Sequence, residues 1–291
     1  MGAVWDAAAD DTSIEMRAMP PRPARAIWEY VELKEVEPDS VVVLIPYKLH
    51  VPLWWSVRLY RMIQNAGMDV GILGSQLPAV DVARDRLVEQ AMEMGYKTAL
   101  WIDSDVIAPE DAFHRLITRY QVQGEDMPFV SGVYYARRSD ILVPNVWTLA
   151  KECPACLALW EPDKLACGRC HADLTAIGEY LRHLPLAKQQ TFADAVGLGL
   201  CRVDLDLYRR LDPPWHFLAN RFRKLAEEGR LPEWIRPNLY KDLPVSEDFY
   251  FCLRVRKQLH EKILVLGDLR ARHAIAMSYI DENGQLLVGI G

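Results

Sequence analysis

The chain has 291 residues, which is enough for one large domain or two small ones with a sizeable core. Asp and Glu (40) outnumber Lys and Arg (34), and the formal net charge of -6 argues against a globally basic nucleic-acid binder. No apolar run is long enough to span a bilayer, and the N-terminus lacks the apolar core of a secretory signal. We therefore expect a cytoplasmic protein without a membrane span.

Strands and helices are predicted to alternate in the first third of the chain. Short apolar runs are typical of buried strands at 41–45, 69–73 and 98–102. Helical spacing of apolar residues predicts two helices between them, at 52–66 and 80–95. This order indicates an α/β domain with a mostly parallel sheet flanked by helices. We place it at 39–291, after an N-terminal extension at 1–38.

The third strand ends at two carboxylates, Asp103 and Asp105, on either side of Ser104. The C-terminal edge of an open α/β sheet is where ligands bind. In an extended chain residues i and i+2 point to the same side, so both carboxylates can converge on one cation, and such ligands suit Mg²⁺ or Mn²⁺. The alternative is a solvated turn before a helix that opens at Pro109.

Two other stretches have a structural and a functional interpretation. Arg84 and Asp85 lie in the second helix, either on a solvated face with local ion pairs or with Arg84 pointing across the sheet edge towards a diphosphate or base. After a strand at 128–133, the residues 134–138 add two aromatic side chains and two arginines. They fit a surface turn better than a substrate rim.

Four of the six cysteines form two Cys-x-x-Cys pairs: Cys153, Cys156, Cys167 and Cys170. Two such pairs match a closed tetrahedral Zn²⁺ site, with His171 as an alternative ligand. We expect a zinc-ribbon-like insertion at 150–173 that is held by structural zinc. Cys201 and Cys252 stand in apolar segments and are expected to be core thiols.

The last third of the chain adds a glycine pair, an acidic helix start and a lone histidine. Gly197 and Gly199 interrupt a strand at 195–203 and leave room beside it. Ser246 is a good N-cap for a helix whose first turn carries two acids, an arrangement that needs no active site. His273 follows a strand expected at 263–266, and a lone histidine is more often structural than a ligand.

Taken in order, these segments resemble the inverting family 2 of the nucleotide-sugar glycosyltransferases, which have the GT-A (Rossmann-like) fold. The resemblance covers roughly 41–273. It is carried by Ile45-Pro46, Val82-Ala83-Arg84-Asp85, Trp101-Ile102-Asp103-Ser104-Asp105, Val196-Gly197-Leu198-Gly199, Ser246-Glu247-Asp248 and His273. It implies a transferase that moves a sugar from a nucleoside-diphosphate sugar to an acceptor hydroxyl, with inversion.

The resemblance also implies a role for each matching residue. Asp103, Asp105 and His273 are expected to hold Mn²⁺ or Mg²⁺ on the donor diphosphate. Asp248 is expected to be the catalytic base and Glu247 its orienting neighbour, or the base itself. The donor nucleotide is expected against Pro46, Tyr47, Arg84, Asp103 and Ser104, and the acceptor near Gly197, Gly199 and Trp215.

Two departures leave the acceptor open. The family often has Asn after the arginine, where this chain has Asp85. The zinc knuckles lie outside the usual family pattern. The acceptor is therefore a glycan, a small molecule, a protein or a modified nucleic acid.

Two other classes compete with this assignment. Haloacid-dehalogenase-type phosphatases also carry a strand followed by Asp-x-Asp, but their motif normally lies on the first strand, and here at least two strands precede it. A zinc ribbon can also act as a module that binds nucleic acid or a protein. The charges of residues 151–171 are balanced and give no electrostatic attraction for nucleic acid.

Overall fold

The structure is a computed structural model of the chain. It describes residues 31–34, 40–47, 51, 53–76, 79–138, 141–160, 163–177, 180–184, 190–217, 246–273, 276–280 and 286–290. Residues 1–30 and 35–38 of the expected N-terminal extension lie outside this description. The strand β1 (Val31–Lys34) within it pairs with β6 (Arg119–Val122), so this part of the extension docks on the main body.

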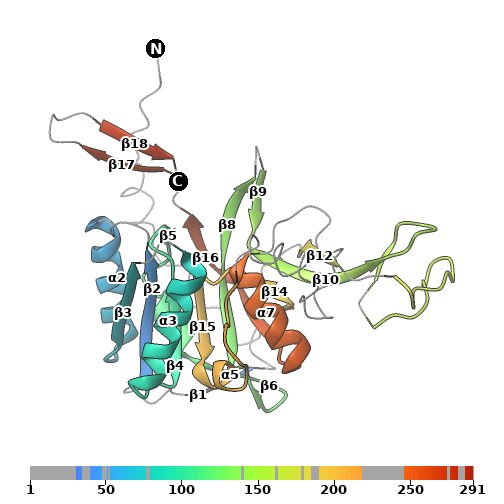
Figure 1. The fold of residues 1–291 in the computed structure, drawn as a ribbon, viewed down its shortest axis with the longest axis horizontal. Coiled ribbons are helices and arrows are strands. Elements are labelled where there is room, and N and C mark those ends of the chain that lie inside the picture. The colour runs from blue at the N-terminus through green and yellow to red at the C-terminus, as the bar shows by residue number, and fades with distance from the viewer. Residues whose placement is uncertain are drawn as a thin grey trace.

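A nine-stranded mixed sheet forms the centre of the molecule (Figure 1). Its main path runs in the order β13-β16-β8-β15-β4-β2-β3, with β5 paired to β16 and β9 paired to β8. The bounds are β2 (Val41–Tyr47), β3 (Gly71–Gln76), β4 (Thr98–Ile102), β5 (Val106–Ile107), β8 (Phe129–Arg138), β9 (Ile141–Pro144), β13 (Thr191–Ala193), β15 (Leu200–Asp204) and β16 (Ile263–His273).

The α/β prediction is confirmed, but the sheet is mixed. The strands β3, β2 and β4 are parallel, as the alternation of strands and helices predicts. The strand β15 then runs antiparallel to both β4 and β8. The described residues between β8 and β15 contain no helix, and strands that are joined without a helical crossover can pair antiparallel.

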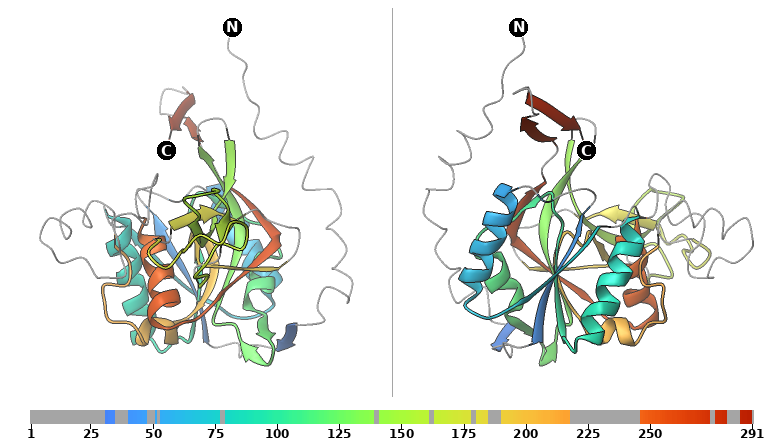
Figure 2. Two further views of the ribbon diagram at one scale, coloured as in Figure 1. Left: turned by 90° about the vertical axis from the view of Figure 1, so that its right-hand side faces the viewer. Right: turned by 60° about the vertical axis from the view of Figure 1, so that its left-hand side comes forward.

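Helices cover both faces of this sheet. Figure 2 shows α2 (Leu53–Ala66) and α4 (Ala112–Ile117) on one side, and α3 (Val80–Glu93) and α7 (Glu247–Gln258) on the other. Because side chains alternate along a strand, Trp101 packs on the α3 and α7 side, and its neighbours Leu100 and Ile102 pack on the α2 and α4 side. Two covered faces explain why β2 and β4 read as continuous apolar runs.

The remaining strands build three smaller sheets. The strand β7 (Glu125–Asp126) extends the β1–β6 pair, and β17 (Ala276–Ile280) pairs with β18 (Leu286–Ile290). The strand β10 (Val146–Glu152) pairs with β11 (Leu159–Trp160), β12 (Tyr180–His183) and β14 (Ala195–Val196). This last group forms an arm that leaves the central sheet (Figure 1). The four paired cysteines flank β11 in the chain, two before it and two after it.

Several predicted boundaries move. The strand expected at 128–133 continues through Arg138 as β8, so residues 134–138 are not a surface turn. The helix expected at Pro109 begins only at Ala112 as α4, and α5 (Leu205–Arg209) follows β15. None of the helices in the part of the chain that the structure describes is both long and apolar enough to cross a membrane.

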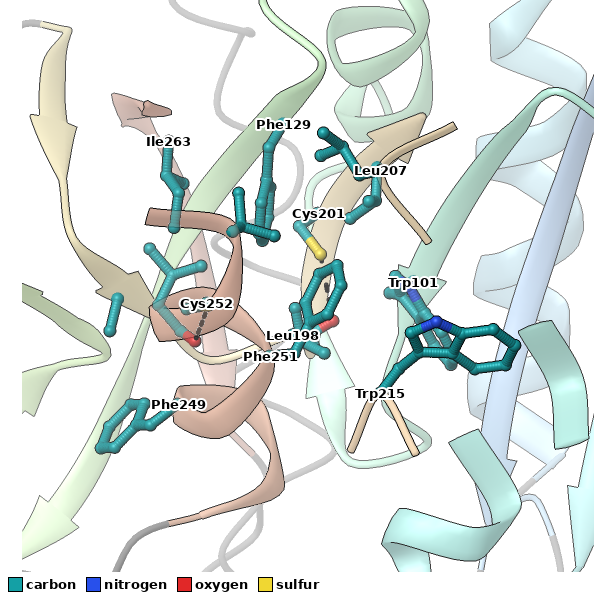
Figure 3. Packing of buried hydrophobic residues seen from close by; sticks show 14 of the residues in the cluster. Trp101, Phe129, Leu198, Cys201, Leu207, Trp215, Phe249, Phe251, Cys252 and Ile263 are labelled. Carbon is teal, nitrogen blue, oxygen red and sulfur yellow. Dashed lines mark hydrogen bonds between the residues drawn. The ribbon is translucent and has the colours of Figure 1, made fainter. Parts of the chain in front are cut away.

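Cys201 and Cys252 are core thiols, as predicted. Both side chains are fully buried in the cluster between the sheet and α7. Each sulfur lies against a backbone carbonyl oxygen, Cys201 against Leu198 at 3.5 Å and Cys252 against Val196 at 3.4 Å (Figure 3).

Candidate functional site

Arg84 is the centre of a buried charged cluster. Its side chain is only 1% exposed. Its Nη2 donates to Asp103 Oδ1 at 2.9 Å, and its Nε lies 3.4 Å from both Glu247 Oε1 and Asp248 Oδ1. The guanidinium lies over the ring of Trp101, 5.1 Å from its centroid. The solvated-face interpretation is therefore wrong for Arg84, which points across the sheet edge. We call Arg84 and these three acids the carboxylate cluster.

Local structure explains why these residues meet. Asp103 follows Trp101 by two residues, and Trp101 packs on the face that α3 and α7 cover. The first turn of α7 presents both of its acids to the same point. Ser246 caps this helix as predicted, because its Oγ accepts from the backbone N–H of Phe249 at 3.4 Å.

Asp103 and Asp105 flank a turn. The backbone N–H of Val106 donates to the carbonyl oxygen of Asp103 at 3.0 Å, which closes a four-residue turn around Ser104. The argument from an extended chain is therefore wrong, because the chain reverses immediately after β4. The backbone N–H of Asp103 also donates to Gly199 O at 3.1 Å, which fixes the start of the turn. Both acids remain half-buried at the C-terminal edge of β4.

The cluster holds three carboxylates against one guanidinium. Burial works against the charge on Arg84, but Asp103, Asp248 and Glu247 outweigh it and raise its pKa. Burial also raises the pKa of Asp103 and, more strongly, that of Asp248, although Arg84 opposes both shifts. Within the described residues, Arg84 Nη1 and Asp248 Oδ1 have no hydrogen-bond partner.

Tyr134 occupies the room that the two glycines leave. A Cβ on Gly197 would collide with Tyr134 Oη, and a Cβ on Gly199 would lie 2.7 Å from Asp103 Oδ2 and 3.0 Å from Tyr134 Cζ. The backbone N–H of Gly199 donates to Tyr134 Oη at 3.4 Å. Burial and the acids Asp248 and Asp103 raise the pKa of Tyr134, so its hydroxyl stays protonated. The glycines therefore admit a protein side chain, where an acceptor was expected.

Asn145 joins Tyr134 to Gly197. Its Oδ1 accepts from the backbone N–H of Tyr134 at 2.8 Å, and its Nδ2 donates to Gly197 O at 3.4 Å. Two backbone bonds of 3.0 Å link the same three residues. The sequence signal for both side chains was weak, because Tyr134 followed an apolar strand and Asn145 stood alone between apolar residues.

The predicted donor residues lie along the same sheet edge. Pro46 and Tyr47 end β2, and the register of β2 with β4, Leu44 opposite Trp101, brings Pro46 level with Asp103. The Tyr47 ring packs beside Gly74, where a Cβ would lie 3.2 Å from the ring. His273 ends β16 opposite Val106, so its backbone lies next to the Asp103–Asp105 turn.

Trp215 has a core role. It is 5% exposed, and its Nε1 donates to the carbonyl oxygens of Tyr208 at 2.9 Å and Leu211 at 2.8 Å. Its indole closes the C-terminal end of α5 and leaves little surface for an acceptor. The acceptor-side assignment of Trp215 is therefore corrected.

The four paired cysteines form a second cluster, which we call the cysteine cluster. It comprises Cys153, Cys156, Cys167 and Cys170, whose sulfur atoms all lie within 4.8 Å of one another. Two sulfur–sulfur distances are 3.5 and 3.6 Å. Four thiolates about 2.3 Å from a tetrahedral zinc ion would be roughly 3.7 Å apart. The cluster is therefore compatible with a metal ion such as Zn²⁺.

The two knuckles repeat one backbone design. In the first, Leu157 N donates to Cys153 O at 2.9 Å, and in the second His171 N donates to Cys167 O at 2.8 Å. Leu157 and His171 both have positive φ, of 58° and 60°. His171 thus closes a turn and its side chain is exposed, while four sulfurs complete the ligand set without it. Burial opposes ionisation of Cys167, but backbone N–H groups lower its pKa to about 6.

Comparisons with known proteins give little to set beside this geometry. No family model matches the chain, and no curated protein is significantly similar to it. Among solved structures, the chain is similar to A197 from STIV, with a TM-score of 0.43 and 16% identity. The match covers 86% of this chain and 94% of that one. A likeness of this degree carries no functional argument.

Proposed function

We propose that the chain is a metal-dependent glycosyltransferase of the GT-A fold that transfers a sugar from a nucleoside-diphosphate sugar to an acceptor hydroxyl with inversion. One observation carries the proposal. The Asp-x-Asp turn after β4 and the Glu-Asp pair at the start of α7 meet on one buried arginine, although Arg84 and Glu247 are 163 residues apart in the sequence.

The charge of the site fits a divalent cation. Three carboxylates of the cluster face a single guanidinium, and Asp105 adds a fourth acid at the edge. Asp103 and Asp105 would hold Mn²⁺ or Mg²⁺, because carboxylate oxygens suit both ions. His273 would join them, because its position on β16 is opposite Val106. Such a cation stabilises the negative charge that builds on the leaving diphosphate.

Arg84 and Asp248 then have distinct tasks. Arg84 Nη1 retains N–H donors that no described group accepts, which suits a donor diphosphate oxygen. Asp248 takes the proton of the acceptor hydroxyl, and its raised pKa brings it closer to the operating pH of a general base. Glu247 orients the same arginine. Pro46 and Tyr47 border the nucleobase at the end of β2.

The cysteine cluster fits a structural role. We propose that it binds Zn²⁺ as a closed site, which agrees with reduced thiolates in the cytoplasm. The arm begins at Asn145, which contacts the residues beside the carboxylate cluster, so the arm is placed to help position a large acceptor. Deleting 150–173 would then abolish transfer and spare hydrolysis of the sugar nucleotide.

The phosphatase alternative is weaker. A phosphatase of that type needs the first Asp of the motif as a free nucleophile. Here Asp103 Oδ1 is held by Arg84 at 2.9 Å. Release of phosphate from p-nitrophenyl phosphate, compared with hydrolysis of a sugar nucleotide, separates the two activities.

Thermal stabilisation by UDP, GDP, CDP and dTDP, each with and without Mn²⁺, tests the proposal. A ligand that binds only the folded state raises the midpoint of unfolding. We expect a metal-dependent shift with one nucleotide, which Asp105→Ala removes and Asp69→Ala, an exposed acid on another loop, leaves intact. The absence of a shift with every nucleotide contradicts the donor assignment. Product analysis by NMR that shows retention contradicts the role of Asp248.

A further inference from the structure

Asp85, the residue that departs from the glycosyltransferase pattern, is paired with a buried histidine. The single oxygen Oδ1 of Asp85 accepts from the backbone N–H of His216 at 2.9 Å and lies 2.8 Å from its ring Nδ1. The His216 side chain is fully buried and that of Asp85 is 19% exposed. Asp85 thus holds a segment that is 131 residues away in the sequence.

The two contacts assign the protons of the ring. Nδ1 must carry a proton to donate to the carboxylate, so Nε2 is left as an acceptor. Tyr208 Oη lies 3.5 Å from Nε2, which makes a weak bond, and itself accepts from Trp101 Nε1 at 3.2 Å. If the His216 ring is neutral, each of these N–H and O–H donors has an acceptor. Burial lowers the pKa of His216, while Asp85 opposes that shift.

His216 also packs against Trp101, whose ring lies against the Arg84 guanidinium. Its ring meets the Trp101 ring edge-on at 5.8 Å between centroids, and the Arg84 guanidinium lies over the same Trp101 ring. The rings of Tyr208 and Phe251 lie 5.7 and 5.3 Å from His216. His216 therefore touches both supports of Arg84, namely the next residue on α3 and the aromatic ring under the guanidinium.

The segment before His216 is itself tightly held. Arg254 of α7 donates to the carbonyl oxygens of Asp212 at 2.6 Å and Pro214 at 2.8 Å. The helix that carries Glu247 and Asp248 thus fixes the position of His216, and His216 fixes α3 through Asp85. The two helices that meet at the carboxylate cluster are therefore coupled a second time, through the segment 212–216.

The geometry points to Asp85 and His216 as a positioning pair that holds Arg84 over Trp101 and against its three carboxylates. For its catalytic consequence the inference rests on the proposed function, because Arg84 is there the contact to the donor diphosphate. Misplacing such a contact by about 1 Å can lower a rate by up to roughly a hundredfold.

The first test needs no substrate. In ¹⁵N NMR spectra of the full chain at pH 7, we expect His216 to be neutral with its proton on Nδ1, and the Arg84 Nε–H to exchange slowly with water. Asp85→Leu should accelerate that exchange at least tenfold, and Asp85→Asn, which keeps an oxygen acceptor, should not. A charged His216, a proton on Nε2, or Arg84 exchange that Asp85→Leu leaves unchanged overturns the inference.

The second test measures kinetics with the sugar nucleotide identified by thermal stabilisation. We expect Asp85→Leu to lower kcat about tenfold or more with KM changed less than twofold, and Asp85→Asn to restore wild-type kcat. Equal loss in both variants, or a fall in stability with unchanged kcat, overturns the positioning role. If Asp85→Leu does not fold, the position of the ring proton of His216 in the wild-type chain still tests the inference. A wild type without activity, but with the expected NMR result, contradicts the proposed function alone.

Discussion

The cysteine cluster and the carboxylate cluster each gather four side chains, but they are assembled differently. The cysteine cluster comes from one short stretch, 153–170, and two repeated turns place its sulfurs. The carboxylate cluster takes Arg84 from α3, Asp103 from the end of β4, and its other acids from the start of α7. The first depends on local turns and the second on the whole sheet.

This difference decides what holds each cluster together. Among the residues that the structure describes, the core beside the cysteines contains three buried residues, Cys153, Cys167 and Leu174, too few to stabilise a fold without a metal ion. The carboxylate cluster lies between α3, α7 and a large apolar core, which keeps it in place. Four expected outcomes test this contrast.

The largest effect is expected from removing metal from the cysteine cluster. A structural zinc contributes an apparent binding free energy of about 10–16 kcal/mol to its domain. Chelation of zinc, or Cys167→Ala, should unfold the two cysteine knuckles and leave the central sheet and the strands packed on its core folded. Metal analysis and amide NMR spectra would show loss of zinc with collapse of the knuckle signals only. Cys201→Ala, in the main core, should keep the zinc, and knuckles that stay folded without metal contradict the contrast.

Arg84→Met should destabilise the main body by about 3–5 kcal/mol, because it leaves buried carboxylates without their cation. Denaturant unfolding at pH 7 measures this loss. Arg86→Met, two residues along the same helix and exposed, should change stability by less than about 0.5 kcal/mol. Similar losses in both variants would show that the cluster is not held by Arg84.

Gly197→Ala should cost about 1–3 kcal/mol, because the new methyl group meets the Tyr134 hydroxyl. Tyr134→Phe removes the nearest atom, so Gly197→Ala should cost less in that background. A double-mutant cycle of unfolding free energies measures this coupling. Strictly additive costs would mean that the two residues do not compete for the same space.

The smallest effect concerns pH. The pKa of Asp248 is raised in the folded state, so the folded chain binds its proton at higher pH than the unfolded chain. The free energy of unfolding should therefore increase as the pH falls from neutral towards the ordinary value of about 4. Asp248→Asn should flatten this slope and stabilise the chain by about 1 kcal/mol at neutral pH. Asp206→Asn, an exposed acid, should leave the slope unchanged.

The sequence predicted the parts of this structure that local patterns specify. The strand Thr98–Ile102, the Ser246 cap and the four clustered cysteines follow from apolar runs, capping chemistry and spacing. The antiparallel insertion of β15 could not be predicted, since strand order depends on contacts between distant segments. For the same reason, nothing in the sequence showed that Tyr134 fills the space beside Gly197 or that Asp85 accepts from His216.

The place of β16 has a consequence for synthesis on the ribosome. This strand lies inside the sheet, between β8 and β13, yet it is made after all of the strands with which it pairs. A growing chain that ends before residue 263 therefore exposes the long edge of β8, and such an edge pairs readily with other chains. Arg84 and Asp103 are likewise made long before Glu247 arrives to complete their cluster. A nascent chain that ends at Gln258 is expected to aggregate, and the soluble yield of that truncation would show whether the last strand of the central sheet is needed to protect the earlier ones.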